Sequence, residues 1–253
     1  MQSNRLLEKL SAGKVVLGLT NMYPASGILE GMCQGWDFVW LDGQHGEHDY
    51  RSLLHAVQCA DRMGIDAMIR VPSHERGVLG MYADLAPAAI MVPMVDNAKQ
   101  ALAVAENLRF PPQGKRSYGG RRVIDRNGRN FFQEQKLLVV AQIETVQAIE
   151  EASQIIAVEG IDVLFYSPDD LKLSLGIEVN TPLDGHPKLL EALETVGNAA
   201  KAAGKYCGVP ARSPELAVKC KSLGYQLIGG GNDAMFLRTS AVKALEDLTE
   251  ALG

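Results

Sequence analysis

Charged and amide side chains recur in this sequence at positions that directly follow short apolar runs. The residues concerned are Asp42 and His45, Arg70, Gln142 and Glu144, and Asp169 and Asp170. If the apolar runs are strands, these side chains lie at the C-terminal ends of several separate strands, which is where a β/α barrel assembles its active site. The positions of these residues therefore predict an enzyme.

Two of the acidic residues are candidates for a metal site. Glu144 and Asp170 follow neighbouring expected strands, so their carboxylates can converge at one end of a barrel. Two carboxylates, completed by water and substrate oxygens, suit a hard divalent cation such as Mg²⁺ or Mn²⁺. A pair of strand-end acids held in salt bridges is the structural alternative, and the spacing does not distinguish the two.

Arg70 ends an apolar run, so its guanidinium is expected to be partly enclosed. An enclosed positive charge is costly unless an anion or an acidic side chain pairs with it. A substrate carboxylate or a developing enolate is one such partner, since a planar guanidinium binds two oxygens at once. Asp66 or Asp84 is an equally good structural partner.

His45 is a candidate for proton transfer, because histidine exchanges protons near neutral pH. It lies between Gly43 and Gly46, which permit close backbone approaches that bulkier residues would hinder. The alternative is an ordinary surface histidine. His48 would complete an H-x-x-H metal pair, but no third ligand is apparent nearby, which disfavours zinc.

Eight apolar runs alternate with segments of helical periodicity, the pattern of repeated βα units around a parallel sheet. We expect strands at residues 15–19, 38–41, 67–70, 89–92, 137–143, 163–166, 206–208 and 227–229, and helices at 53–62, 98–108, 146–156, 189–203 and 214–223. The first expected turn has no G-x-G-x-x-G, which argues against a dinucleotide-binding fold. We therefore predict an α/β fold with a single domain, a (β/α)8 TIM barrel over residues 1–253.

The charge and cysteine content of the sequence restrict its expected binding partners and cellular location. The net charge of −5 and the pI near 5.6 give no reason to expect binding to nucleic acid or an anionic membrane, because both need clustered basic charge. The four cysteines form no C-x-x-C pair, which predicts buried free thiols and a cytoplasmic protein. No apolar run is long enough to predict export or membrane insertion.

Three further segments each allow two interpretations. The connection 110–130 holds five arginines, which suits either a lid over an anionic substrate or a basic loop that is solvated or contacts another subunit. The run Gly229-Gly230-Gly231-Asn232 is either an anion-binding turn or a simple tight turn. The amphipathic segment 233–252 either closes the barrel or packs on a neighbouring subunit.

Four motifs, in this order and spacing, resemble the HpcH/HpaI aldolase/citrate lyase family of class II pyruvate aldolases. They are FVWLDGQHG at 38–46, IRVP at 69–72, VAQIET at 140–145 and GIDVLFYSPDDL at 160–171. The resemblance covers nearly the whole chain and implies a barrel of the phosphoenolpyruvate/pyruvate type that assembles into trimers or hexamers. It also implies reversible cleavage of a 4-hydroxy-2-oxo acid, such as 4-hydroxy-2-oxoheptanedioate or a 2-keto-3-deoxy sugar acid, to pyruvate and an aldehyde through a metal-bound enolate.

The resemblance further implies a role for each matching residue. The catalytic residues it implies are His45 as acid/base, Asp84 as the acid that raises the basicity of His45, Arg70 as the clamp for pyruvate and the enolate, and Asp42. The implied ligands of the metal, which would be Mg²⁺, Mn²⁺ or Co²⁺, are Glu144 and Asp170. The implied contacts of the keto acid are Arg70, Gln142 and the turn of Ser167, Pro168 and Asp169.

Within these four motifs the sequence departs from the family pattern at three positions. Gln44 replaces a usual Glu, Ser167 a usual Gly, and Asp169 a small residue. An additional carboxylate at Asp169 would repel an anionic substrate unless its side chain points away. Two alternative functions follow: a relative acting on oxaloacetate or an acyl-CoA as a citrate-like synthase or lyase, and a non-catalytic barrel that binds a keto acid.

Overall fold

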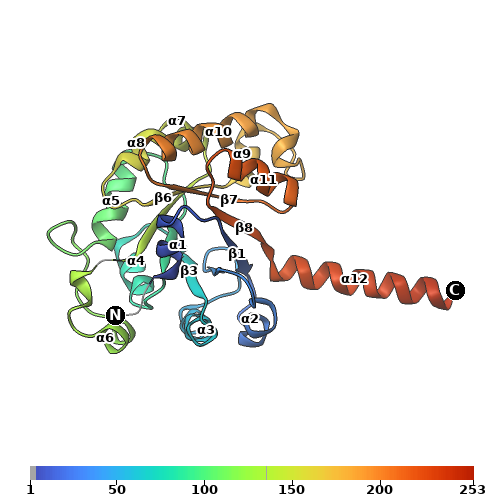
Figure 1. The fold of residues 1–253 in the computed structure, drawn as a ribbon, viewed down its shortest axis with the longest axis horizontal. Helices are drawn as coiled ribbons and strands as arrows, with labels where there is room; N and C mark the ends of the chain where they lie inside the picture. Colours follow the sequence, from blue (N-terminus) through green and yellow to red (C-terminus); the bar gives the residue numbers. More distant parts are fainter. Residues whose placement is uncertain (1–3, 135) are drawn as a thin grey trace.

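The computed structural model describes residues 4–134 and 136–253, which form a closed barrel of eight parallel strands (Figure 1). The strands are β1 (Val16–Asn21), β2 (Phe38–Asp42), β3 (Asp66–Arg70), β4 (Ala89–Val92), β5 (Leu138–Ile143), β6 (Val163–Tyr166), β7 (Tyr206–Pro210) and β8 (Leu227–Asn232). Each strand pairs with the next along the chain, and β8 pairs with β1. The predicted (β/α)8 barrel is confirmed, and every expected strand overlaps an observed one.

Helices follow the strands and surround the barrel (Figure 1). They are α1 (Arg5–Ser11), α2 (Ser26–Met32), α3 (Tyr50–Met63), α4 (Arg76–Ala83), α5 (Ala98–Leu108), α6 (Arg121–Asn127), α7 (Val146–Glu150), α8 (Ala152–Ala157), α9 (Pro168–Leu175), α10 (Pro187–Ala202), α11 (Pro214–Ser222) and α12 (Asp233–Leu252), with the short 3-10 helices η1 (Phe131–Gln133) and η2 (Leu183–Gly185). The helix expected at 146–156 is interrupted at Glu151, where φ is −96° and ψ is 10°. Helices α1, α2, α4, α6 and α9 have seven or eight residues, too few for a clear periodicity.

The barrel interior is filled by the side chains of alternate strand residues, because successive residues of a strand point to opposite faces. Phe38 and Trp40 of β2 and Val140 of β5 belong to this interior cluster. Leu6 and Leu10 of α1 join it, while the Leu6 N–H donates to Asp66 at the start of β3. Helix α1 therefore closes the N-terminal end of the barrel, and the C-terminal end is left for the polar residues.

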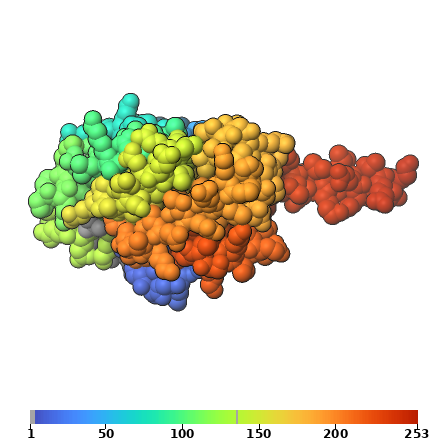
Figure 2. All heavy atoms as spheres, turned by 90° about the horizontal axis from the view of Figure 1, so that it is seen from above, coloured from blue at the N-terminus to red at the C-terminus, as the bar shows by residue number. Residues whose placement is uncertain are grey.

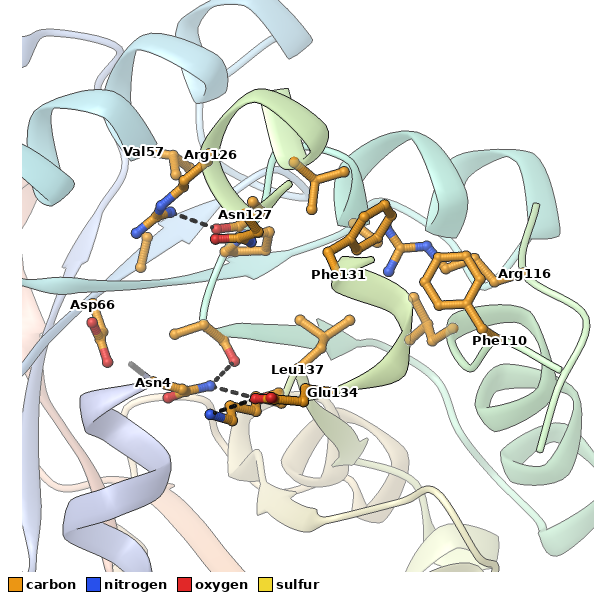
Figure 3. Close-up of a pocket in the computed structure, with 18 of the residues that line it drawn as sticks. Asn4, Val57, Asp66, Phe110, Arg116, Arg126, Asn127, Phe131, Glu134 and Leu137 are labelled. Atoms are coloured by element: carbon orange, nitrogen blue, oxygen red, sulfur yellow. Dashed lines mark hydrogen bonds and ion pairs between the residues drawn. The ribbon is translucent and has the colours of Figure 1, made fainter. Parts of the chain in front are cut away.

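The segment 110–130 folds against the N-terminal half of the barrel wall. Arg122 and Arg126 form ion pairs with Asp61 near the end of α3, and Arg122 also donates to the Leu85 carbonyl before β4. Phe110 packs against Phe131, beside a cavity of about 110 Å³ (Figure 3). Within one chain, therefore, the structure does not support the interpretation of this segment as a lid over the substrate, because Arg116, Arg122 and Arg126 pair with Asp84 and Asp61, away from the C-terminal end.

Helix α12 has 20 residues and extends away from the barrel (Figures 1 and 2). Its base is fixed because the buried Asp233 carboxylate accepts hydrogen bonds from the Asn21 side chain at 2.7 Å and from the Met22 and Tyr23 N–H groups. Beyond that base its apolar side chains are exposed, so the interpretation that this segment closes its own barrel is wrong. Among the residues that the structure describes, none of the helices combines the length and the apolar character needed to cross a membrane.

Candidate active site

In β2 and β5 the residues that face the barrel interior change from apolar to polar at the C-terminal end of the barrel. In β2 the interior residues are Phe38, Trp40 and then Asp42, and in β5 Val140 is followed by Gln142. Asp42 and Gln142 are almost fully buried. A polar layer therefore lies directly on the apolar interior, as the positions of these residues in the sequence predict.

Asp42 and Arg70 form a buried ion pair across neighbouring strands, where they face each other in register. Arg70 Nε donates to Asp42 Oδ1 at 2.9 Å, Nη2 donates to Oδ2, and the guanidinium lies 5.0 Å from the centroid of the Trp40 ring. Burial alone would raise the pKa of Asp42, but the hydrogen bonds and charge of Arg70 outweigh it and the pKa is lowered. Arg70 is thus held in place by Asp42 and by its contact with Trp40.

The turn after β2 presents His45 on the protein surface. Its N–H donates to Asp42 Oδ1 at 3.1 Å, as does that of Gln44. A Cβ on Gly43 would lie 2.7 Å from the Arg70 carbonyl oxygen, and one on Gly46 would lie 2.4 Å from that of Asp42, so both glycines are required for close packing. The His45 side chain is exposed at this end of the barrel.

His48 does not complete a metal pair with His45. Its Nε2 atom lies 3.0 Å from Asn21 Oδ1, and its Nδ1 atom lies 3.3 Å from Ser52 Oγ. Both ring nitrogens of His48 therefore take part in a structural network that links the turns after β1 and β2.

Glu144 and Asp170 converge at the C-terminal end of the barrel. Glu144 is buried, its Oε1 atom accepts the Met94 N–H at 2.8 Å, and Asp170 lies within hydrogen-bonding reach of it. Burial and, after it, the neighbouring carboxylate of Asp170 raise the pKa of Glu144 to about 7, although the hydrogen bond from Met94 opposes this rise. Arg70 is close enough to lower this pKa, so the ion pair and the two acids share one site.

Met94 has a backbone conformation that side chains rarely adopt, with φ at 55°. This conformation follows β4 directly and presents the Met94 N–H to Glu144. Strained residues of this kind cluster at functional sites, where the surrounding structure holds them in place. Nothing in the amino-acid types around position 94 signals this conformation.

Gln142 and Ser167 lie beside Glu144. Gln142 Nε2 donates to Glu144 Oε2 and to Ser167 Oγ, the latter at 3.0 Å, so the serine at the unusual position is part of the network. The Gln142 Oε1 atom is buried without a hydrogen-bond partner in the described structure. Buried polar atoms are rarely left unpaired, so this oxygen marks a place for a ligand, a cation or water.

The carboxylate of Asp169 is neutralised by neighbouring cations. Lys172 Nζ donates to Asp169 Oδ1 at 2.9 Å and to the Val179 carbonyl oxygen at 3.0 Å, and Arg212 Nη2 lies 4.0 Å from Asp169 Oδ2. The repulsion that Asp169 would exert on an anionic substrate is therefore offset by the buried Lys172. The sequence motifs gave no indication of either cation, because their contacts depend on the fold of α9 and of the turn after β7.

The structure places Asp84 away from His45. Asp84 follows α4, a helix that runs back from the C-terminal end of β3 toward the start of β4, and its carboxylate accepts a hydrogen bond from Arg116 at 2.8 Å. Within one chain, the role of Asp84 as partner of His45 is therefore not supported. The structural pairing of Arg70 with Asp66 or Asp84 is also wrong, because Asp66 pairs with Arg5 and Arg70 pairs with Asp42.

The glycine run after Ile228 is the end of β8 and leads directly into α12. A Cβ on Gly230 would lie 2.7 Å from the Trp36 ring, and one on Gly231 would lie 2.6 Å from the Phe236 ring. Asn232 caps α12 by accepting the Met235 N–H at 2.7 Å. The run is therefore part of a strand and not a tight turn, and close packing accounts for Gly230 and Gly231.

A divalent cation fits the chemistry of the Glu144 and Asp170 pair. Two adjacent carboxylates are both ionised at little cost only when a cation lies between them, and the buried Gln142 oxygen adds a further acceptor nearby. No group of three or more His, Cys, Asp or Glu side chains in residues 4–134 and 136–253 is arranged to hold a metal. Water or substrate oxygens would therefore complete the coordination, as hard cations allow.

Comparison with known proteins agrees with this geometry. A family model described as HpcH/HpaI aldolase/citrate lyase matches residues 25–239. The chain is 31% identical to a 2-keto-3-deoxy-L-rhamnonate aldolase of Shigella sonnei (strain Ss046), over 92% of this chain and 88% of that protein.

Solved structures of HpcH/HpaI family proteins with a similar fold agree with this family match. An HpcH/HpaI aldolase from Desulfitobacterium hafniense DCB-2 is 29% identical with a TM-score of 0.87, covering 97% of this chain and 96% of that one. A family protein from Burkholderia cenocepacia J2315 is 25% identical with a TM-score of 0.88, covering 98% of this chain and 100% of that one. The chain is a class II aldolase, hence a carbon–carbon lyase, and it belongs to the HpcH/HpaI aldolase/citrate lyase family.

Proposed function

We propose that this aldolase reversibly cleaves a 4-hydroxy-2-oxo acid to pyruvate and an aldehyde. The observation that carries the proposal is the convergence of Glu144 and Asp170 beside the Asp42–Arg70 pair at the C-terminal end of the barrel. The rhamnonate aldolase relative is consistent with a substrate that has a 2-oxo acid at one end.

Glu144 and Asp170 are the residues that would hold a divalent cation, Mg²⁺, Mn²⁺ or Co²⁺. Such a cation supplies Lewis-acid stabilisation of negative charge on the oxygens of a keto acid. Arg70 adds a second, fixed positive charge, and Asp42 keeps its guanidinium in place, so little reorganisation is needed as charge develops.

The first turn of α9 provides the site for the substrate carboxylate. Backbone N–H groups at a helix N-terminus lack intrahelical partners and bind anions. Pro168 begins α9 and Asp169 follows it, while Lys172 holds the Asp169 side chain by an ion pair. Gln142 lies beside this turn through its hydrogen bond to Ser167, so its amide is placed to contact the keto acid.

His45 exchanges the proton of the 4-hydroxyl group, either directly or through water. We expect His45→Ala to lower kcat for pyruvate release by about a hundredfold to ten-thousandfold, the usual contribution of a general acid/base. The binding of pyruvate should change little, because His45 is exposed and does not contact Arg70, Glu144 or Gln142 in the hydrogen bonds of the described structure. The exposed His55 of α3 gives the control variant His55→Ala, and an unchanged kcat for His45→Ala would remove His45 from the mechanism.

A screen of 4-hydroxy-2-oxo acids with added divalent metal, read out as pyruvate, tests the proposed reaction. Release of CoA from an acyl-CoA without release of pyruvate would instead favour a citrate-like synthase or lyase. Keto-acid binding without any turnover that EDTA suppresses would favour a non-catalytic barrel.

The chain also has the features of a homo-oligomer, a trimer or hexamer, in which α12 packs on a neighbouring copy. Leu245, Leu248 and Leu252 are 67%, 62% and 88% exposed. In a (β/α)8 barrel the helix after β8 normally covers the outer wall near β1, but here Leu17 on the outer side of β1 is 46% exposed. Apolar surface on both elements is suited to burial by exchange of α12 between copies.

We expect the double substitution of Leu245 and Leu248 by Ser to shift the protein to a smaller assembly in sedimentation velocity at micromolar concentration. Each buried leucine contributes about 1.5–3 kcal/mol, so two removed at every interface are enough to dissociate it. Lys243→Gln on the same helix is the matched control. A wild-type chain that sediments as a monomer would contradict the assembly.

The whole chain acts as one catalytic domain in this proposal. Its four cysteines are buried free thiols, which is consistent with the reducing environment of the cytoplasm.

A further inference from the structure

Arg212 occupies a fixed position at the C-terminal end of the barrel. It lies in the short connection between β7 and α11, and both of its neighbours are anchored. The Ala211 N–H donates to the Gly229 carbonyl oxygen at 2.9 Å, and Ser213 caps α11 by accepting the Leu216 N–H at 3.2 Å. The backbone at Arg212 is therefore held, while its side chain is 60% exposed and reaches to within 4.0 Å of the Asp169 carboxylate.

The Arg212 side chain lies beside Asp169, the residue before the expected metal ligand Asp170. Strands β6 and β7 are neighbours, so the start of α9 and the turn after β7 lie next to each other. Arg212 Nη2 lies 4.0 Å from Asp169 Oδ2. A pair between two exposed side chains at this distance contributes little, and it leaves guanidinium donors able to bind another anion.

Asp169 is also neutralised without Arg212. The Lys172 side chain is only 6% exposed, and its Nζ atom donates to Asp169 Oδ1 at 2.9 Å. Arg70 is likewise paired with Asp42. In the proposed reaction, a divalent cation balances Glu144 and Asp170 and Arg70 faces the 2-oxo acid, so Arg212 is the positive charge in this group of residues that has no role in the reaction itself.

Arg70 and Arg212 differ in how deeply they are buried. Arg70 is buried at the base of the site, whereas Arg212 lies exposed at its rim. On the proposed function, the 2-oxo acid end of the substrate binds near Arg70, so its chain runs outward past Asp170. We infer that Arg212 is a specificity-determining residue that pairs with a second anionic group, a carboxylate or a phosphate, at the far end of the substrate.

The test is aldol addition of pyruvate to matched aldehydes, and it rests on the proposed reaction. Succinic semialdehyde against butanal reports on a carboxylate, and glyceraldehyde 3-phosphate against glyceraldehyde reports on a phosphate. For at least one pair, we expect wild type to favour the charged aldehyde in kcat/KM, with the preference reduced by 0.5 M NaCl through screening. Arg212→Gln should lower that preference about fivefold, through KM rather than kcat.

Lys221→Gln is the matched control, since Lys221 is an exposed cation at the far end of α11. It should leave the preference unchanged, and Arg212→Lys should retain part of it. Equal use of charged and neutral aldehydes by wild type and Arg212→Gln would overturn this inference and leave the aldolase proposal standing. Failure of every aldehyde to react with pyruvate would instead overturn the proposed reaction itself.

Discussion

Asp170→Asn is expected to reduce the rate of pyruvate release by about a thousandfold or more, because a metal that stabilises developing charge contributes several kcal/mol to catalysis. The change removes one negative charge and keeps the shape of the side chain. Asp170 is exposed, so the fold should be unaffected and the thermal midpoint nearly unchanged. The measurement is the initial rate at saturating Mn²⁺, together with a calorimetric scan.

Glu144→Gln is expected to have an equally large effect on the rate. The buried Glu144 also accepts hydrogen bonds from Met94 and Gln142, so this variant tests the same site from the second ligand. Asp184→Asn, an exposed acid in η2, is the control for loss of one carboxylate. Full activity in either Asp170→Asn or Glu144→Gln would reject the assignment of these two residues as metal ligands.

Arg70→Ala is expected to impair both stability and activity. Removing the guanidinium leaves the Asp42 carboxylate buried without its ion-pair partner, which typically costs about 3–5 kcal/mol. Since the folded state lowers the pKa of Asp42 below its ordinary value of 3.8, the stabilisation by this pair is present above that pH and is lost as the pH falls through the lowered value. Urea unfolding of wild type and Arg70→Ala at pH 7 and at pH 3 measures the loss of stability and its dependence on pH.

The double variant Asp42→Ala with Arg70→Ala separates structure from catalysis. It leaves no unpaired buried charge, so much of the lost stability should return. Activity should not return, because the positive charge beside the keto acid is still missing. Recovery of activity in the double variant would show that Arg70 has only a structural role.

The strands and most of the site residues could be predicted because local patterns determine them. Apolar runs of four to six residues define the strands, and the residue that follows each run lies at the C-terminal end of the barrel. Glu144 and Asp170 follow neighbouring strands, so the sequence alone predicts that they lie together. The same alternation that buries Val140 places Gln142 in the interior.

The contacts between distant residues could not be predicted in this way. Asp42 and Arg70 are 28 residues apart, and their pairing depends on the register between β2 and β3. Asp84 was assigned by resemblance alone, but its position after α4 turns it toward Arg116. The five arginines of 110–130 have the composition of a substrate lid, yet the aromatic cluster around Phe110 fixes this segment elsewhere.

The direction in which α12 leaves the barrel also could not be predicted from the sequence. Its amphipathic pattern predicts an apolar face that must be covered, but the pattern is the same whether its own barrel or another copy covers it. The hydrogen bonds of Asp233 with Asn21 and Met22 fix the angle at which the helix leaves the barrel. This angle exposes both the helix and Leu17.

Titration of Mn²⁺ into the EDTA-treated protein, followed by electron paramagnetic resonance of the free ion, tests the metal site most directly. We expect one Mn²⁺ to bind per chain, with affinity strongly weakened in both Glu144→Gln and Asp170→Asn and unchanged in Asp184→Asn. Wild-type protein that binds no Mn²⁺, or binding that survives both substitutions, would contradict the account.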